Sequence, residues 1–310
     1  WPIMERKVPK GDVPGEWYSP TQPIPTKPPP LDRQGFTAAD VIDFTPELHA
    51  EGLRLIKNYV TGPIYTPPSL FKRDGTWGTL ASHRTGGCAW PGGSYDPETF
   101  TAYIYTKNEI DLTAIQHNTD MARSDFEWIM SSAPPKGDPP LVRDGFKPAQ
   151  TTVQGLPLPK PPYGRITAVD LTKGEFAWQR AHGETPDAVR NHPALKGLNI
   201  PRTGQAGIVG PMVTKTLVIC GDPAVTTAAS GKRGAMLRAY DKKTGEEMGA
   251  VYMSAPQIGN AMTYMVKGVQ YIVVATGGGS FEGELVAYRL PRSEATAKIA
   301  APSTLQGREQ

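Results

Sequence analysis

Two segments of this chain repeat one short pattern that severely limits the folds available to it. Residues 164–179 read GRITAVDLTKGEFAWQ, and residues 235–250 read AMLRAYDKKTGEEMGA. In each copy an alternating apolar run ends at an Asp, and a Gly follows four residues later. The Asp can accept hydrogen bonds from turn amides, and the Gly can supply the positive φ of a tight turn. The pattern therefore predicts two equivalent β-hairpins.

The two copies differ at one large side chain, and a third copy is weaker. Trp178 follows the first turn, where the second copy has Met248 or Gly249. Residues 94–105 read SYDPETFTAYIY, with Phe100 where a Gly would be expected. Repeats of this kind indicate a β-structure in which each unit buries its faces against its neighbours, and a propeller blade fits best. Unrelated hairpins of a β-sandwich remain the alternative.

Short apolar alternations closed by turn residues predict an all-β chain with long proline-rich loops and one or two short helices. Residues 1–70 contain 13 of the 32 prolines, which favour extended backbone. Thr45 and Pro46 are typical of a helix start, so we expect one helix at about 45–58. We expect the following organisation: a covering segment at 1–85, blade strands at 86–108, a loop insertion at 109–163, repeated blade units at 164–292 and a tail at 293–310.

Composition and motifs argue against several functions. The chain has 33 basic and 30 acidic residues, so we expect no nucleic-acid partner. No run approaches the roughly 20 apolar residues of a membrane span. The five histidines lack metal-site spacing, and the segments SGKRG and GGGSFEG lack the spacing of phosphate-binding loops. Two cysteines are too few for a disulfide framework, and we expect both to pack as small buried hydrophobes.

The repeated pattern and several longer stretches resemble the pyrroloquinoline-quinone (PQQ) dependent dehydrogenases, the quinoprotein family of alcohol and glucose dehydrogenases. The family's tryptophan-docking motif resembles the repeat, and in it a Trp from each blade stacks against the next blade. An eight-bladed propeller is typical of the family, and this chain would supply about four blades. The resemblance places Trp1 inside a blade, so we expect the C-terminal half of a propeller. The matching stretches are SPTQPIPTKPPP, KPPYGRITAVDL, GPMVTKTLVICGD and NAMTYMVKGVQYIVVATGGG.

The resemblance also implies which loops face the propeller axis, where the family binds PQQ with Ca²⁺. The family's general base and metal ligands would lie upstream of residue 1, so we expect no catalytic and no metal-binding residue in this chain. Relatives commonly read Gly-Ala-Asn-Trp-Gly at 87–91, where this chain has Ala89 in place of the Asn. One polar contact with the cofactor would thereby be lost. The implied cofactor-binding residues are Ala89, Trp90, Ile208, Val209, Gly210, Gly278, Gly279, Ser280 and Phe281.

Two functions of different classes follow from the resemblance. The first is the C-terminal half of a PQQ-dependent dehydrogenase that oxidises an alcohol or sugar hydroxyl, with the catalytic half upstream. The second is a non-catalytic, propeller-derived scaffold or accessory subunit of a larger periplasmic or membrane-associated assembly, with no cofactor bound in this chain. Both imply a partner, either an N-terminal propeller half or another subunit. The family's location implies the periplasm.

Overall fold

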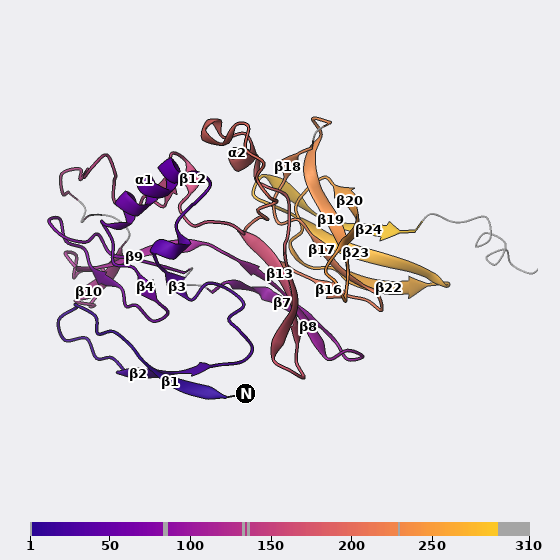
Figure 1. The fold of residues 1–310 in the computed structure, drawn as a ribbon, viewed down its shortest axis with the longest axis horizontal. Coiled ribbons are helices and arrows are strands. Elements are labelled where there is room, and N and C mark those ends of the chain that lie inside the picture. The colour runs from indigo at the N-terminus through magenta and orange to yellow at the C-terminus, as the bar shows by residue number, and fades with distance from the viewer. Residues whose placement is uncertain (1, 83–85, 132–133, 135–136, 229, 291–310) are drawn as a thin grey trace, which may run out of the picture.

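The computed structural model of the protein describes residues 2–82, 86–131, 134, 137–228 and 230–290. Within them, four sheets of three to five strands follow one another in chain order, from the left of Figure 1 to the right. The sheets do not close into a ring. The fold is thus a partial β-propeller, as the repeat predicts, and not a β-sandwich. Trp1 and the expected tail at 293–310 lie outside the described residues.

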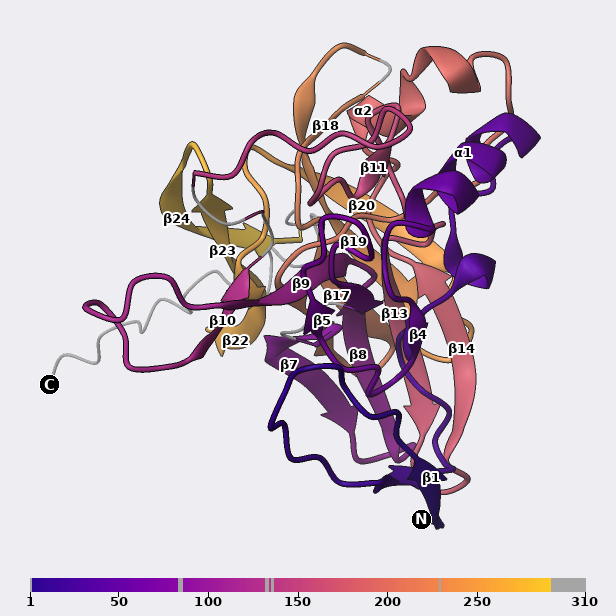
Figure 2. The same ribbon diagram turned by 90° about the vertical axis from the view of Figure 1, so that its left-hand side faces the viewer.

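The N-terminal segment covers the first sheet and contains the longest helix of the described residues. Thr45 caps helix α1, because its hydroxyl accepts a hydrogen bond from the amide of Leu48 at 3.2 Å. The β1–β2 hairpin lies at the lower edge of the molecule in Figures 1 and 2, and α1 lies at the upper edge. The elements are β1 (Ile3–Lys7), β2 (Thr21–Pro25), β3 (Gly35–Phe36), the 3₁₀ turn η1 (Ala38–Asp40), α1 (Pro46–Ile56) and β4 (Gly62–Pro63).

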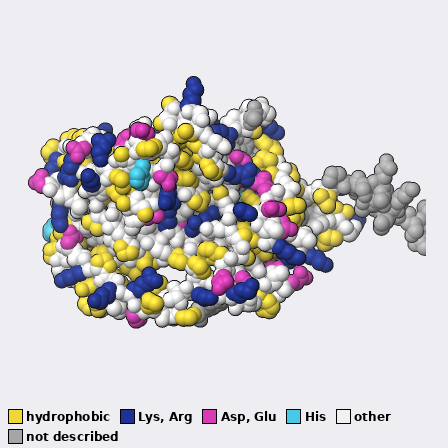
Figure 3. All heavy atoms as spheres, viewed as in Figure 1, with side chains coloured by type: hydrophobic (Ala, Val, Ile, Leu, Met, Phe, Trp, Pro, Cys, Tyr) yellow, Lys and Arg dark blue, Asp and Glu magenta, His cyan; other side chains and the backbone are white. Residues whose placement is uncertain are grey.

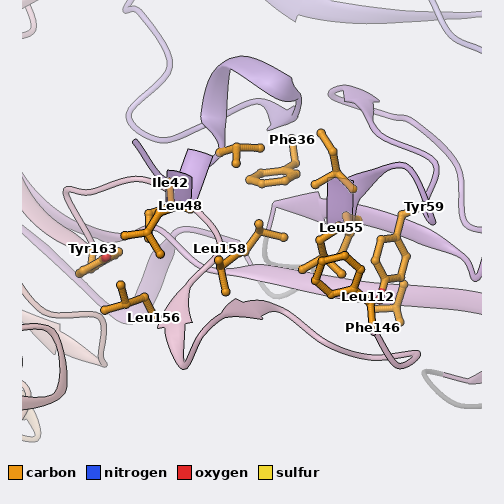
Figure 4. Close-up of a cluster of buried hydrophobic side chains, with 14 of the residues drawn as sticks. Phe36, Ile42, Leu48, Leu55, Tyr59, Leu112, Phe146, Leu156, Leu158 and Tyr163 are labelled. Carbon is orange, nitrogen blue, oxygen red and sulfur yellow. The ribbon is translucent and has the colours of Figure 1, made fainter. Parts of the chain in front are cut away.

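The first sheet differs from the sequence expectation for 109–163, which is not simply a loop insertion. Strand β9 pairs with β10, with β5 and with β6, which comes from the covering segment. Side chains from both segments share one buried cluster, to which Phe146 and Leu156 contribute beside Leu55 (Figure 4). The strands of the first sheet are β5 (Ser69–Leu70), β6 (Thr79–Ser82), β9 (Ile110–His117) and β10 (Trp128–Ser131). A separate two-stranded sheet consists of β11 (Thr152–Val153) and β12 (Leu156–Pro157).

The second, third and fourth sheets are antiparallel, and the second and third contain the repeated units. The second has the order β14-β13-β8-β7, the third has β16-β17-β19 with β18 and β20 beside β19, and the fourth has β22-β23-β24. The second-sheet strands are β7 (Cys88–Asp96), β8 (Thr101–Lys107), β13 (Gly164–Asp170) and β14 (Glu175–Ala181). Helix α2 (Asp187–Arg190) and the 3₁₀ turn η2 (Pro193–Leu195) follow. The later strands are β15 (Val209–Gly210), β16 (Met212–Val213), β17 (Leu217–Gly221), β18 (Thr226–Thr227), β19 (Arg233–Asp241), β20 (Glu247–Met253), β21 (Gly259–Asn260), β22 (Met262–Val266), β23 (Val269–Gly278) and β24 (Phe281–Arg289).

The predicted hairpin turns form as the repeat requires. The carboxylates of Asp170 and Asp241 each accept hydrogen bonds from the amides two and three residues later. Gly174 and Gly245, with φ of 66° and 70°, donate back to the carbonyl of the same Asp. In the third copy Phe100 takes the same left-handed conformation, with φ of 52°. The turn geometry therefore survives there without the glycine.

Trp178 joins the second sheet to the third. Its side chain is 8% exposed and its Nε1 donates to the carbonyl of Lys242 at 3.0 Å. A Cβ on Gly245 would lie only 2.6 Å from the indole ring, so this glycine permits the close approach as well as the turn. Tyr103 of the same sheet also packs against the indole, with ring centroids 5.8 Å apart. Cys220 is buried in the same cluster.

A buried ion pair lies beside this contact. The Nζ of Lys242 donates to Oδ2 of Asp96 at 2.7 Å, and both side chains are almost completely buried. Asp96 ends the inner strand β7, so the pair also joins the second and third sheets. The hydrogen bond from Lys242 holds the pKa of the Asp96 carboxyl below its ordinary value.

The expectation of two buried cysteines is wrong for one of them. Cys220 lies within strand β17 and is fully buried, but Cys88 is exposed. Cys88 begins strand β7 and follows Gly86 and Gly87, where the inner edge of the second sheet opens to the surface. Its position at a strand end, and not its residue type, sets its exposure.

Replacing Trp178 with alanine should destabilise the chain by about 3–5 kcal/mol, because the change removes a large buried side chain and leaves a cavity between two sheets. The measurement is the free energy of unfolding from urea titration. Trp17 is 87% exposed, so Trp17→Ala is the matched control and should change stability by less than about 0.5 kcal/mol. Equal effects of the two variants would contradict the structural role given to Trp178.

The ion pair should make stability fall in acid. Since the pKa of Asp96 is lowered by folding, its contribution is complete above the unfolded value of about 3.9 and is lost as the pH falls through the folded value. Asp96→Asn should lower the free energy of unfolding at pH 7 by about 1–3 kcal/mol. The difference between the two proteins should shrink towards pH 2 in urea titrations. A difference that does not change with pH would show that the charge of Asp96 contributes nothing.

Candidate functional site

A short two-stranded sheet of β15 and β21 lies beside the inner strand β7 of the second sheet, and one amide side chain links them. Strands β15 and β21 pair in parallel, with Val209 opposite Gly259 and Gly210 opposite Asn260. The Nδ2 of Asn260 donates to the carbonyl of Pro91 in β7 at 2.8 Å. Residues that are about 170 positions apart in the sequence therefore meet at one end of the propeller arc.

A second amide side chain holds the backbone behind this point. Gln257 is almost fully buried, and its Oε1 accepts from the amide of Gly221 at 2.6 Å. Its Nε2 donates to the carbonyls of Gly210 and Gly259 at 3.0 and 2.8 Å. All of its hydrogen-bonding groups are thus used within the protein, so Gln257 positions the strands β15 and β21 and is not free to bind a ligand.

The glycine run at the end of β23 lies against the same region. The amide of Gly277 donates to the carbonyl of Pro256, and the amide of Ile258 donates to the carbonyl of Ala275, both at 2.9 Å. Gly278 pairs with Phe281 across the turn into β24. Gly278, Gly279 and Ser280 are exposed in that turn. The structure therefore brings the turn to the edge of the surface formed by β15 and β21.

Three exposed hydrophobic side chains from these strands and loops define what we call the axial face: Trp90, Ile208 and Ile258. Their exposed fractions are 84%, 46% and 41%. Groups of exposed hydrophobic side chains mark interaction sites, whereas single ones are common on protein surfaces. Val209, in contrast, is fully buried and packs in the core between the second and third sheets. Ala89 lies in β7, but its side chain is outside the described part of the chain.

Sequence reasoning did not identify Gln257, Ile258 or Asn260. The available signal was the order Gln-Ile-Gly-Asn at 257–260, in which two amide side chains flank a glycine ahead of a strand. An amide pair of this kind is often used to satisfy backbone groups at close strand approaches. Pro91, to which Asn260 bonds, and Gly221, to which Gln257 bonds, are both distant from these amides in the sequence.

The charged groups of the described residues do not form a metal centre. No cluster of three or more His, Cys, Asp or Glu side chains is found among them. None of the described helices is long and apolar enough to cross a membrane. On the face shown in Figure 3, basic and acidic side chains are interspersed among hydrophobic ones. What the axial face can offer a ligand is apolar surface, exposed glycine backbone and the amide of Asn260.

A row of antiparallel sheets with buried junctions and adjoining inner strands defines the chain as part of a β-propeller domain. The profile of the glucose/ethanol/alcohol dehydrogenase β-propeller domain, the PQQ family, matches residues 1–272, and the chain belongs to this family. The expected family resemblance is thereby confirmed.

The chain is similar to three curated dehydrogenases over most of its length. It is 28% identical over 89% of its length to quinate/shikimate dehydrogenase (quinone) of Acinetobacter baylyi. It is also 28% identical over 94% of its length to the glycerol dehydrogenase large subunit of Gluconobacter oxydans and to quinoprotein glucose dehydrogenase of Escherichia coli. The aligned regions cover 33%, 39% and 36% of those proteins, so the chain spans between about a third and two fifths of their length.

Among solved structures, the chain is similar to the quinohemoprotein alcohol dehydrogenase of Comamonas testosteroni. The two are 18% identical, with a TM-score of 0.41, over 69% of this chain and 28% of that chain. The chain is also 19% identical to quinohemoprotein alcohol dehydrogenase ADHIIG of Pseudomonas putida, with a TM-score of 0.40, over 65% of this chain and 24% of that chain.

Gly210→Ala should disturb the axial face without unfolding the chain. A Cβ at residue 210 would overlap Oδ1 of Asn260, which sits at the end of a short side chain and would have to rotate away. The bond from Asn260 to Pro91 would then break, and exposed polar contacts of this kind contribute only about 0.5–1.5 kcal/mol. We expect a correspondingly small loss of unfolding free energy in urea. An equal loss from Gly210→Ala in an Asn260→Ala background would contradict the steric link.

Proposed function

We propose that this chain is the C-terminal part of the propeller of a PQQ-dependent dehydrogenase that oxidises an alcohol or sugar hydroxyl. The family match over residues 1–272 carries the proposal. The names of its relatives support the substrate class, because quinate, glycerol and glucose all bear hydroxyl groups. The general base and other catalytic groups would come from protein outside this chain.

The axial face suits one side of a planar cofactor. Trp90, Ile208 and Ile258 would pack against the ring system, and apolar packing of this kind typically provides most of the binding free energy in cofactor sites. Asn260 and the exposed turn at 278–280 would contact the polar edge of the cofactor. When bound, PQQ supplies a quinone that accepts the electrons of the substrate. The remaining role of this chain is to orient that ring and exclude water from one side.

The described residues do not fit the calcium ion that the family resemblance implies. Calcium takes six to eight oxygen ligands, usually with several carboxylates, and no acidic cluster occurs in the described part of the chain. We therefore assign no metal ligand here and derive no part of the reaction through a metal.

The contacts of Trp178 support the family interpretation in another way. An indole that packs on the turn glycine of the next sheet, as Trp178 does on Gly245, is the arrangement expected of the tryptophan-docking motif. A partial arc of this kind requires a protein partner at its open sides, and we propose an N-terminal propeller half. The periplasmic location is proposed from the family alone.

The second candidate is a scaffold or accessory subunit that binds no cofactor. One departure favours it: Ala89 stands where relatives carry an Asn, so an amide beside the cofactor is missing. Strand β22 is exposed along its whole length and carries Met262, Tyr264 and Met265. Such a strand is suited to a protein contact in either interpretation.

Binding of PQQ to the purified chain separates the two candidates. The cofactor should quench the fluorescence of Trp90 on binding, and Trp90→Ala should weaken binding at least tenfold because the exposed indole would lie on the ring. Trp17→Ala, at the other most exposed tryptophan, should bind PQQ as the native chain does. Unchanged affinity in Trp90→Ala would exclude the axial face as the cofactor site.

An activity assay tests the enzymatic proposal as a whole. A denaturing gel shows whether a propeller half co-purifies with the chain. The purified material is then supplied with PQQ and Ca²⁺ and assayed for dye-linked oxidation of alcohols and sugars. Oxidation that depends on added PQQ is the expected result. Absence of both PQQ binding and oxidation would favour the scaffold.

A further inference from the structure

The pairing of the strands identifies the residue of the third sheet that corresponds to Trp178. In the second sheet Ala168 pairs with Trp178 on one side and with Tyr103 on the other. In the third sheet Ala239 pairs with Gly249 on one side and with Ile219 on the other. A register shift follows each Ala. Gly249, and not Met248, therefore occupies the place that Trp178 has in the preceding unit.

The space that an indole would fill at Gly249 is open. A Cβ built on Gly249 meets no heavy atom within 4 Å, and Gly249 does not have a positive φ. A cavity of about 500 Å³ lies there between the third sheet and the fourth, and it is open to solvent where Met248 and Val251 are exposed. This volume is within the range of small-molecule sites in proteins. The main lining residues are Ile219, Leu237, Ala239 and Val251 from the third sheet, and Ile272 and Tyr288 from the fourth.

The chemistry of the walls matches a flat aromatic group. Most of the lining is aliphatic, so burial of an apolar ligand would be favourable by about 25 cal/mol for each Å² removed from water. Tyr288 offers a ring edge or face, and Arg289 offers a guanidinium that can stack on an aromatic face. The preceding junction shows how an indole packs in the equivalent position, where it contacts Tyr103 of its own sheet and Gly245 of the next.

We propose that this cavity is a binding site for a small planar aromatic molecule of the size of indole. The molecule lies across Gly249 and takes the place that the side chain of Trp178 takes between the second and third sheets. The cavity is lined by β17, β19 and β20 of the third sheet and by β23 and β24 of the fourth, and none of its lining residues belongs to the axial face. The proposal does not depend on PQQ binding.

Indole itself is the probe, in titrations of the purified chain by calorimetry and by ligand-observed NMR. The expected result is saturable binding to one site, with intermolecular NOEs from indole to the methyl groups of Ile219 and Ile272. Gly249→Trp fills the cavity with a tethered indole, so it should weaken binding at least tenfold and should not lower the melting temperature. The matched control is Gly283→Trp on β24, where a Cβ also meets nothing within 4 Å and which does not line the cavity.

Three outcomes would overturn the proposal. They are the absence of saturable indole binding, NOEs to residues outside the cavity, and unchanged affinity in a folded Gly249→Trp variant. If Gly249→Trp does not fold, Gly249→Leu provides a smaller plug and should still weaken binding at least tenfold. Retained binding in folded Gly249→Leu, with the same NOEs, would equally contradict the assignment.

Discussion

Three groups of the second sheet converge on Lys242, and the relative position of two sheets depends on them. The carbonyl of Lys242 accepts hydrogen bonds from Nε1 of Trp178 and from Oη of Tyr103, both at 3.0 Å. Its ammonium donates to Asp96. A buried charge is costly unless it is paired with good geometry, so this contact tolerates little displacement. One residue in a turn therefore fixes the third sheet against the second.

The axial face lies at the other end of the same junction. Asn260 bonds to Pro91 there, and Gln257 ties the backbone of Gly210 to that of Gly221. Strand β7 is thus tied at two points, because Asp96 at its end bonds to Lys242 and Pro91 accepts a hydrogen bond from Asn260. Trp90 lies in β7 and Ile208 directly precedes β15, so the shape of the apolar surface follows from how these two strands adjoin. The site is a property of the junction more than of either sheet.

Features that depend on local chemistry could be predicted from the sequence, and features that depend on distant partners could not. The turns at Asp170 and Asp241 are satisfied by amides two and three residues away, and their positions follow from the repeat. Strand β9 was missed because its partner β6 comes from residues 79–82, in a segment expected only to cover the sheet. The sequences of β6 and β9 mix polar and apolar residues, and nothing in either sequence indicates that the two strands pair.

The same distinction applies to the candidate site. The glycine turn at 278–280 could be located, because a run of glycines after a strand is visible in the sequence. Asn260 could not, because its role comes from Pro91, 169 residues away. The choice between Met248 and Gly249 stayed open for a different reason. A register shift after Ala239 changes which residue of β20 faces the next sheet, and counting along the sequence does not reveal it.

The contrast between the two junctions bears on how the arc behaves as a whole. Between the second and third sheets, a buried indole and an ion pair reinforce the apolar core. Between the third and fourth sheets, the core consists mainly of aliphatic side chains, including Val274, and the open cavity at Gly249 lies beside it. Because Gly249 contributes no side chain where the preceding junction has the buried indole of Trp178, the fourth sheet is expected to separate more easily than the third. That sheet bears the turn at 278–280, which lies beside the axial face. A partner that binds strand β22 only in the folded chain would stabilise the fourth sheet and with it this turn.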